Sequence, residues 1–252
     1  MFTRAIVRRP SPEMIHGIST ARLGLPDPGL ALKQHDAYVR ALEGGGLIVD
    51  VLDPEPGFPD GCFVEDVAVV CEGVAIVGSL GALARRGEQE TVAPALARFR
   101  PIAHVEPPAT FEGGDVLRMG NLFFIGLSTR TNPAGARSLA AILRSHGHEV
   151  RIVDCDIGLH LKTDVNPVGE DVLLVSPYFD LLPEFADFRR IVVEDDEAHA
   201  RNSLWVNGTI FTPTGFPRTR EKLERLGMPV MTLDVSEFRK LDGGLTCLSL
   251  RF

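Results

Sequence analysis

The sequence predicts an α/β protein built from repeated units that are arranged radially around one shared centre. Five helical segments, each followed by a short apolar strand, recur along the 252 residues. A polar cluster and further strands come after each pair, which gives five β-rich units of about 40 to 55 residues. Because radial repetition surrounds a central channel, every unit is expected to bring polar side chains to the same place.

Five segments are predicted to be helical. Pro133 and Pro217 stand near a first helical position, where proline is favoured because its φ is already fixed. Gly44 and Gly227 lie where C-terminal caps belong. The predicted helices cover residues 30–43, 88–99, 133–145, 182–187 and 217–226, and the fourth is short.

Short strands complete each unit. Those that directly follow the helices are expected at residues 47–52, 101–105, 150–153, 190–193 and 229–233. Polar clusters come next, at residues 60–66, 112–115, 160–162, 202–206 and 242–247. Further strands are expected at residues 67–70, 74–77, 116–117, 122–125, 172–175 and 209–212, with a docked strand at the C-terminal end. A doubly wound parallel sheet is the alternative, but no nucleotide-type glycine loop joins the first strand to the first helix.

The composition excludes several classes of protein. Hydrophobic residues make up 44% and charged residues 24%, as in an ordinary soluble protein. The net charge of −8 argues against nucleic acid or an anionic membrane surface as the partner. No apolar run approaches about 18 residues and residues 1–9 lack a signal-peptide core, so we expect a cytoplasmic protein without a membrane span. Four cysteines without C-x-x-C spacing fit reduced thiols better than disulfides or zinc: Cys62, Cys71, Cys155 and Cys247.

Cys247 is a candidate nucleophile near the C-terminal end. Gly243 and Gly244 precede it, and glycines allow close backbone approach and positive φ. Such a turn can present a reactive side chain. The alternative interpretation is a small buried core residue, which is the usual state of a free cysteine.

Two acidic clusters are candidates for binding a cation. Asp60, Glu65 and Asp66 lie beside an apolar strand, where a carboxylate is costly unless it is paired. Two carboxylates suit a planar guanidinium, because bidentate pairing fixes its orientation. Glu112 and Asp115 flank two glycines. The alternatives are a solvated turn for the first cluster and a hairpin or bulge for the second, with Asp115 as a structural acceptor.

His160, Arg85 and Arg130 complete the candidate set. His160 lies between leucines, and it is either a core residue whose ring nitrogens are hydrogen-bonded or a general acid/base. Arginines in turns are usually solvated, but their planar fork also binds a substrate carboxylate. A cysteine, a histidine and a glutamate from three units can serve as nucleophile, acid/base and orienting group. Acids for a cation and arginines for a carboxylate then describe a zwitterionic, arginine-like ligand.

Five motifs in order resemble those of dimethylarginine dimethylaminohydrolases. The motifs are FPDGCFVEDVAVV (58–70), FEGGDVL (111–117), STRTN (128–132), LHLKT (159–163) and LDGGLTCLSLRF (241–252). The similarity extends along the whole chain and includes residues 85–88 and 217–222. The resemblance implies a pentein-type five-bladed α/β propeller with pseudo-fivefold ββαβ units around a central channel, formed by residues 1–252 as one catalytic domain.

The resemblance also implies a hydrolase that converts asymmetric dimethylarginine or monomethylarginine to citrulline and the methylamine. It implies Cys247 as nucleophile, His160 as general acid/base and Glu112 as the third member. A covalent thiouronium on the cysteine is expected, without cofactor or metal. The family pattern departs at two positions, because leucine is common at Ile18 and some relatives have aspartate at Glu112.

The same resemblance assigns the substrate contacts. Asp66 is expected to hold the guanidinium with Glu65 beside it, and Asp60 to receive the α-amino group with help from the Ile18 backbone. Arg85 and Arg130 are expected to bind the α-carboxylate, and the Leu241 backbone is expected to line the site. The expected partner is thus a small molecule, and the pattern allows a homodimer.

The residues alone are also compatible with three other functions. A metal-dependent hydrolase would hold manganese through Asp60, Glu65, Asp66, Glu112 and His160. A related pentein deiminase would act on arginine, agmatine or another guanidine. A non-catalytic protein would bind arginine analogues and resist labelling at Cys247.

Overall fold

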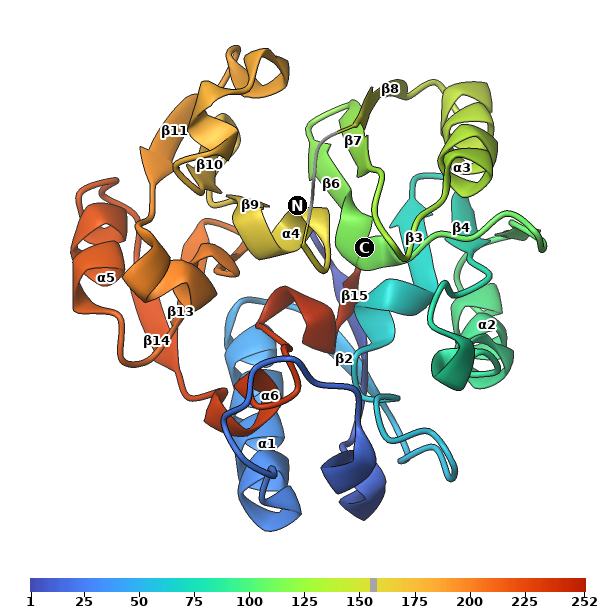
Figure 1. Ribbon diagram of the computed structural model, residues 1–252, viewed down its shortest axis with the longest axis horizontal. Helices are drawn as coiled ribbons and strands as arrows, with labels where there is room; N and C mark the ends of the chain where they lie inside the picture. The colour runs from blue at the N-terminus through green and yellow to red at the C-terminus, as the bar shows by residue number, and fades with distance from the viewer. Residues whose placement is uncertain (155–157) are drawn as a thin grey trace.

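The computed structural model describes residues 1–154 and 158–252, so Cys155, one of the cysteines expected to be reduced, lies outside the described residues. These residues form five three-stranded sheets, which are arranged around a common centre (Figure 1). In each sheet two strands are antiparallel, and a third pairs in parallel with the middle strand. The predicted radial arrangement of five units is therefore confirmed.

Four of the sheets are formed by strands that are consecutive in the sequence. The first contains β3 (Ala68–Cys71), β4 (Val74–Val77) and β5 (Ile102–His104). The others contain β6 (Val116–Met119), β7 (Leu122–Gly126) and β8 (Glu149–Val153); β9 (Val165–Pro167), β10 (Val172–Val175) and β11 (Arg189–Val192); and β12 (Leu204–Val206), β13 (Thr209–Pro213) and β14 (Val230–Leu233).

The fifth sheet joins the two ends of the chain. It contains β1 (Arg4–Arg8), β2 (Ile48–Leu52) and β15 (Leu250–Arg251), and β15 lies antiparallel to β1. The Phe252 carbonyl accepts the Arg4 N–H at 2.9 Å, and the Phe252 N–H donates back to Arg4 at 3.0 Å. The predicted docked strand is confirmed, and it ties down the segment that carries Cys247.

Helices cover the outer side of the sheets, as Figure 1 shows for four of them. These are α1 (Pro28–Gly44), α2 (Gln89–Ala97), α3 (Pro133–Ser145) and α5 (Pro217–Glu224), close to the predicted ranges. Asp27 caps α1 and Asn132 caps α3, since each side chain accepts backbone N–H groups of the first turn. Two shorter helices, α4 (Leu161–Asp164) and α6 (Ser236–Arg239), lie nearer the centre.

The predicted helix at residues 182–187 is wrong. The segment forms two 3₁₀ turns, Phe179–Leu181 and Pro183–Phe185. Leu182 between them is extended, with ψ at 128°. A residue before proline is disfavoured in the helical region because the proline ring collides with its backbone, so Pro183 keeps Leu182 extended and separates the two turns.

The core lies between the helices and their sheets. In the unit that contains β6, β7 and β8, for example, Leu139 and Leu143 of α3 are fully buried with Ile125 of β7. Each such side chain contributes about 1.5–3 kcal/mol through burial. In the described part of the chain, no helix is long and apolar enough to cross a membrane.

A channel of about 850 Å³ lies at the centre of the five sheets. One edge strand of every sheet contributes to its wall, through Val69, Leu117, Asn166, Leu204 and Leu250. The segments that precede these inner strands therefore meet at one end of the channel. This convergence places residues that are distant in sequence in one site.

Two helical glycines provide a test of the packing between units. A Cβ on Gly135 would lie 1.8 Å from the Thr110 carbonyl oxygen, whereas one on Gly44 would meet nothing within 4 Å. We expect Gly135→Ala to lower the free energy of unfolding by about 1–3 kcal/mol through overpacking. Gly44→Ala should leave it unchanged or raise it by about 0.5–1 kcal/mol through lower backbone entropy. Urea denaturation measures both, and equal effects would contradict the proposed packing.

Candidate active site

Five short segments carry polar residues to one end of the channel. Each directly precedes an inner strand: the 3₁₀ turn Val64–Val67 before β3, Gly113–Asp115 before β6, α4 before β9, Asp195–Arg201 before β12 and Thr246–Leu248 before β15. Four of these segments overlap the polar clusters of the sequence, and the fifth, Asp195–Arg201, ends where its cluster begins at Asn202. The repeated topology thus explains why each cluster contributes to a single site.

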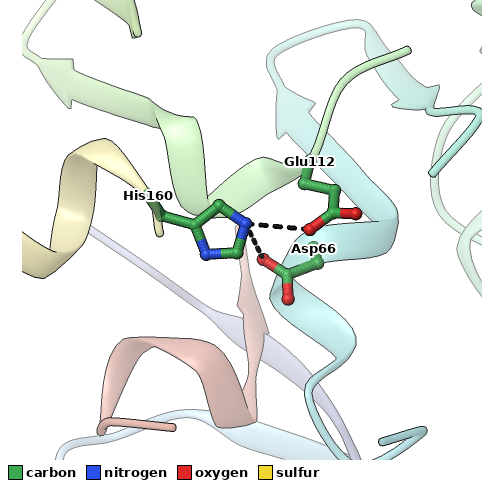
Figure 2. A group of neighbouring side chains, drawn as sticks. All are labelled: Asp66, Glu112 and His160. Carbon is green, nitrogen blue, oxygen red and sulfur yellow. Dashed lines mark hydrogen bonds and ion pairs between the residues drawn. The ribbon is translucent and has the colours of Figure 1, made fainter. Parts of the chain in front are cut away.

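His160, Glu112 and Asp66 form the centre of this site. His160 Nε2 lies 2.8 Å from Glu112 Oε2 and 3.9 Å from Asp66 Oδ1 (Figure 2). Glu112 is completely buried, and its Oε1 accepts the backbone N–H of Ala82 at 3.0 Å. Two acidic side chains from different units therefore face one imidazole.

These charges hold His160 in its protonated form. Burial alone would lower the pKa of the imidazole, but the charge of Asp66, the hydrogen bond that His160 donates to Glu112 and the charge of Asp115 outweigh it and raise the pKa to about 9. Burial likewise opposes ionisation of Glu112, yet the His160 hydrogen bond and charge lower the pKa of this carboxyl to about 2. At neutral pH the pair is an imidazolium and a carboxylate, so His160 is ready to donate a proton.

Gly113 and Gly114 let these groups approach. A Cβ on Gly114 would lie 2.7 Å from the His160 ring and 2.8 Å from Asp66 Oδ1. A Cβ on Gly113 would lie 2.0 Å from the Glu65 carbonyl oxygen. The glycine pair is therefore needed for packing at the site, beyond the hairpin or bulge that was the alternative interpretation.

Asp115 holds the segment that carries His160. Its Oδ1 accepts the Leu161 N–H at 2.9 Å, and its Oδ2 accepts hydrogen bonds from Ser128 at 2.7 Å and Thr131 at 2.6 Å. Asp115 is thus the structural acceptor that the sequence allowed.

Cys247 and His160 line the same small cavity of about 100 Å³. The cysteine is half-buried, and its Sγ accepts the Gly244 N–H at 3.5 Å. Burial, together with the negative charges of Glu65 and Asp66, raises the pKa of the thiol to about 12. The thiol is therefore protonated at neutral pH, and a cation placed beside these carboxylates would favour the thiolate.

The turn before Cys247 differs in one respect from the expectation. Close approach is confirmed, because a Cβ on Gly243 would lie 2.2 Å from Phe63 and one on Gly244 2.3 Å from Asn202. Positive φ occurs instead at Asp242, at 60°. Aspartate tolerates this region better than most side chains.

Asp60, Ile18 and Leu241 lie together at a second position. Both carboxylate oxygens of Asp60 are 3.1 Å from the Ile18 N–H, and burial raises the pKa of this carboxyl. Gly17 lies between Asp60 and the Leu241 side chain, where a Cβ would be 2.9 Å from Asp60 Oδ1. The structure thus brings together three residues that the resemblance grouped.

The two arginines differ in their surroundings. Arg85 is buried, and its nitrogens donate to Asp66 at 2.5 Å, to Glu88 at 2.8 Å and to the Phe63 carbonyl at 3.0 Å. Burial opposes its charge, but Asp66 and Glu88 outweigh this and keep its pKa well above the ordinary value. Against expectation, its fork is mainly occupied by protein partners.

The Arg130 guanidinium is much less engaged. It lies 3.9 Å from Glu112 Oε1, and its side chain is 16% exposed. Within residues 1–154 and 158–252 it donates no hydrogen bond. Arg130 is therefore the more available of the two for a carboxylate.

Glu65 also has protein partners for both oxygens. Oε1 lies 2.6 Å from Lys162 Nζ and 2.9 Å from Arg251 Nη2, and Oε2 accepts the Thr246 hydroxyl at 2.7 Å. Both Glu65 oxygens thus have protein partners, and its place beside a substrate guanidinium stays a prediction. Sequence reasoning missed Lys162 and Arg251, because a lone charge gives no signal of a partner in another unit. It also missed Glu88, although its spacing of three residues from Arg85 is a local signal for an ion pair.

Asp66, Glu112 and His160 have ligand atoms within 4.8 Å of one another, which would suit a small metal ion. Metal binding requires a neutral imidazole nitrogen, whereas the pKa of His160 is about 9. Arg85 also occupies Asp66 Oδ2. This donor set favours acid–base chemistry over metal ligation.

Comparisons with known proteins agree with the site. The family model described as arginine deiminase matches residues 58–200. The N(G),N(G)-dimethylarginine dimethylaminohydrolase of Pseudomonas aeruginosa is 42% identical over 100% of both chains. The enzyme of the same name from Streptomyces coelicolor is 36% identical over 98% of this chain and 96% of its own.

Solved structures show the same relationship. A mutant of the Pseudomonas aeruginosa enzyme complexed with citrulline has a TM-score of 0.98 and 42% identity over 100% of both chains. The N-terminal domain of ArgZ, an arginine dihydrolase bound to substrate, has a TM-score of 0.85 at 23% identity over 98% of this chain and 97% of its own. This second similarity shows the fold alone.

Glu112→Gln tests the electrostatic coupling to His160. Removing the carboxylate charge should lower the pKa of His160 below about 9, and histidine NMR titration measures it. Because the folded pKa is raised, the stability from His160 is fully present below its unfolded value of about 6.5 and is lost as pH rises through about 9. The stability difference between wild type and variant should shrink over that window. An unchanged His160 pKa would contradict the coupling.

Proposed function

Since this chain belongs to the dimethylarginine dimethylaminohydrolase family, we propose that it hydrolyses Nω-methylated arginines to citrulline and a methylamine. The substrates are asymmetric dimethylarginine and monomethylarginine, and residues 1–252 act as one catalytic domain. The observation that carries this proposal is the cavity shared by Cys247 and a His160 that Glu112 keeps protonated. The relative complexed with citrulline, at a TM-score of 0.98, supports it.

Substrate recognition follows from the charges around the cavity. Asp66 holds the guanidinium, with Glu65 adding negative charge beside it. Asp60 receives the α-amino group, near the Ile18 N–H and the Leu241 backbone. These carboxylates are buried, so a bound cation offsets part of the cost of their burial.

Arginines bind the α-carboxylate. Arg130 is the main contact, because its guanidinium is not otherwise hydrogen-bonded within the described residues. Arg85 takes a lesser part, since four of its five N–H groups already face Asp66, Glu88 and Phe63. Its Nη1 retains one further hydrogen for a substrate.

The first chemical step forms a covalent bond to Cys247. The seated guanidinium offsets the charges of Glu65 and Asp66, the thiol releases its proton to solvent, and the thiolate attacks the guanidinium carbon. As the C–N bond breaks, His160 gives its proton to the departing methylamine. The product is a thiouronium on Cys247 and a neutral His160.

The second step regenerates the enzyme. His160 removes one proton from water, which attacks the thiouronium carbon. As the C–S bond breaks, the remaining hydroxyl proton passes to the departing sulfur, which releases citrulline and the Cys247 thiol. Glu112 orients the imidazole throughout. Holding the reacting groups in place contributes to lowering the barrier, by up to about 7–11 kcal/mol in ideal cases.

The second candidate is a deiminase that acts on arginine, agmatine or another guanidine. The arginine deiminase model that matches residues 58–200 favours it. Citrulline formation from asymmetric dimethylarginine, with arginine and agmatine in parallel and EDTA present, distinguishes the two. Turnover of the methylated substrate alone supports our proposal, preference for arginine supports the deiminase, and loss of activity with EDTA supports a metal-dependent hydrolase.

We place the protein in the cytoplasm, because Cys62, Cys71 and Cys247 are free thiols in the structure and such thiols suit a reducing compartment. A homodimer stays a prediction, which light scattering of the purified protein measures.

Cys247→Ser should reduce kcat by at least about 1,000-fold, because a hydroxyl with no nearby base is a poor nucleophile. Substrate should still bind, as calorimetry would show. Cys71→Ala is the control, because Cys71 lies at the end of β3 and does not line the cavity. Turnover by Cys247→Ser at the wild-type rate would contradict the assignment of Cys247 as the nucleophile.

Arg130→Ala should raise KM for methylated arginine by about 10- to 100-fold, since it removes charge-assisted hydrogen bonds. Agmatine lacks the carboxylate, so its inhibition constant as a competitor of methylated arginine should change by less than about threefold on the same grounds. Arg137→Ala on the exposed face of α3 is the control. Equal losses of affinity for methylated arginine and agmatine would rule out the carboxylate contact.

A further inference from the structure

The unit that begins with β12 supplies none of the residues assigned above, although its polar cluster starts at Asn202. We propose that Asn202 is a positioning residue, which fixes the segment of Cys247 relative to the segment of His160. The inference rests on the proposed function, because it assigns these two residues to one reaction. Asn202 is 8% exposed and lines the same cavity.

Asn202 holds both sides of Thr246, the residue before Cys247. Its Oδ1 accepts the Thr246 N–H at 2.9 Å, and its Nδ2 donates to the Thr246 hydroxyl at 3.1 Å. Two bonds to one residue fix the orientation of the turn as well as its position. The 3₁₀ turn that presents Cys247 is thereby held at its first residue.

The same amide reaches the segment of His160. Nδ2 also donates to the Lys162 carbonyl at 3.2 Å, two residues beyond His160. Lys162 in turn pairs with Glu65, which accepts the Thr246 hydroxyl. Asn202, Thr246, Glu65 and Lys162 form a closed ring of contacts that joins four units of the fold.

The side chain at position 202 must be an amide to complete this ring. Both Nδ2 hydrogens and the Oδ1 acceptor are used. A carboxylate would place charge against the Lys162 carbonyl and leave two acceptors without donors. Gly244 packs directly on the amide, where a Cβ would lie 2.3 Å from Oδ1. The turn before Cys247 is thus shaped around this side chain.

Positioning of this kind has a kinetic signature. A displacement of about 1 Å between reacting groups can cost about 100-fold in rate, whereas substrate affinity depends on other residues. Loss of Asn202 should therefore lower kcat with little change in KM. It should also release the Thr246–Leu248 turn and expose the Cys247 thiol.

The test compares Asn202→Ala and Thr246→Val, which removes only the hydroxyl partner, with wild type. Asn121→Ala is the matched control, because Asn121 bridges Gly147 and His148 in a similar way outside the cavity. We expect Asn202→Ala to lower kcat by about 100-fold with KM within about threefold, and iodoacetamide to alkylate Cys247 at least about fivefold faster because the turn opens. The effects of the two variants on kcat should be less than additive when they are combined.

Each outcome is decisive. A kcat for Asn202→Ala within about twofold of wild type, or full additivity with Thr246→Val, would overturn the proposal. A rise in KM that matches the loss of kcat, together with a lower Tm, would show a structural role only and also overturn it. If wild type forms no citrulline, the proposed function fails, while the alkylation rate still tests whether Asn202 holds the turn.

Discussion

Three buried carboxylates impose the constraint on which the rest of the structure depends. Glu65, Asp66 and Glu112 are at most 3% exposed, and a buried charge is strongly unfavourable unless it is paired. Each has a separate cationic partner: Lys162 with Arg251 for Glu65, Arg85 for Asp66 and His160 for Glu112. The pairs of Glu65 and Glu112 join different units, whereas Asp66 and Arg85 belong to the same unit. Closing the ring of units therefore also pairs Glu65 and Glu112 with their cations.

The same carboxylates act on the ionisation of His160 and Cys247. Burial opposes the charge of His160, but the neighbouring carboxylates outweigh it and raise the pKa to about 9. Burial, together with the charges of Glu65 and Asp66, raises the pKa of the Cys247 thiol to about 12. The resting site therefore has an imidazolium that can donate a proton, and its thiol, the proposed nucleophile, is not yet ionised. A bound cationic substrate would lower the pKa of the Cys247 thiol and favour the thiolate. The cysteine would then become reactive only when substrate is bound.

The radial topology makes this concentration of charge possible. Five segments that precede the inner strands contribute one or two polar side chains each, and none of these segments needs a long loop. The C-terminal strand β15 completes the sheet begun by β1, so the nucleophile lies on a segment held by backbone pairing and by Asn202. The position of Cys247 thus depends on contacts with other units of the ring.

The sequence by itself determined the five units and most of their helices and strands. These features follow from local patterns, such as proline at helix starts. Acids beside an apolar strand, a histidine between leucines and a cysteine after two glycines made Asp60, Asp66, Glu112, His160 and Cys247 candidates, and the resemblance to the family supplied their expected roles. Even locally the reasoning failed at residues 182–187, where a 3₁₀ turn, Pro183–Phe185, replaces the predicted helix.

Only the tertiary structure decided how the charged side chains are paired. The sequence assigned Arg85 to a substrate carboxylate, but the fold places it between Asp66 and Glu88. Thr246 and Glu65 meet across 181 residues of sequence, and Asn202 and Thr246 across 44. Such partners have no local signature, because closure of the ring brings them together and the cost of an unpaired buried charge then selects the arrangement.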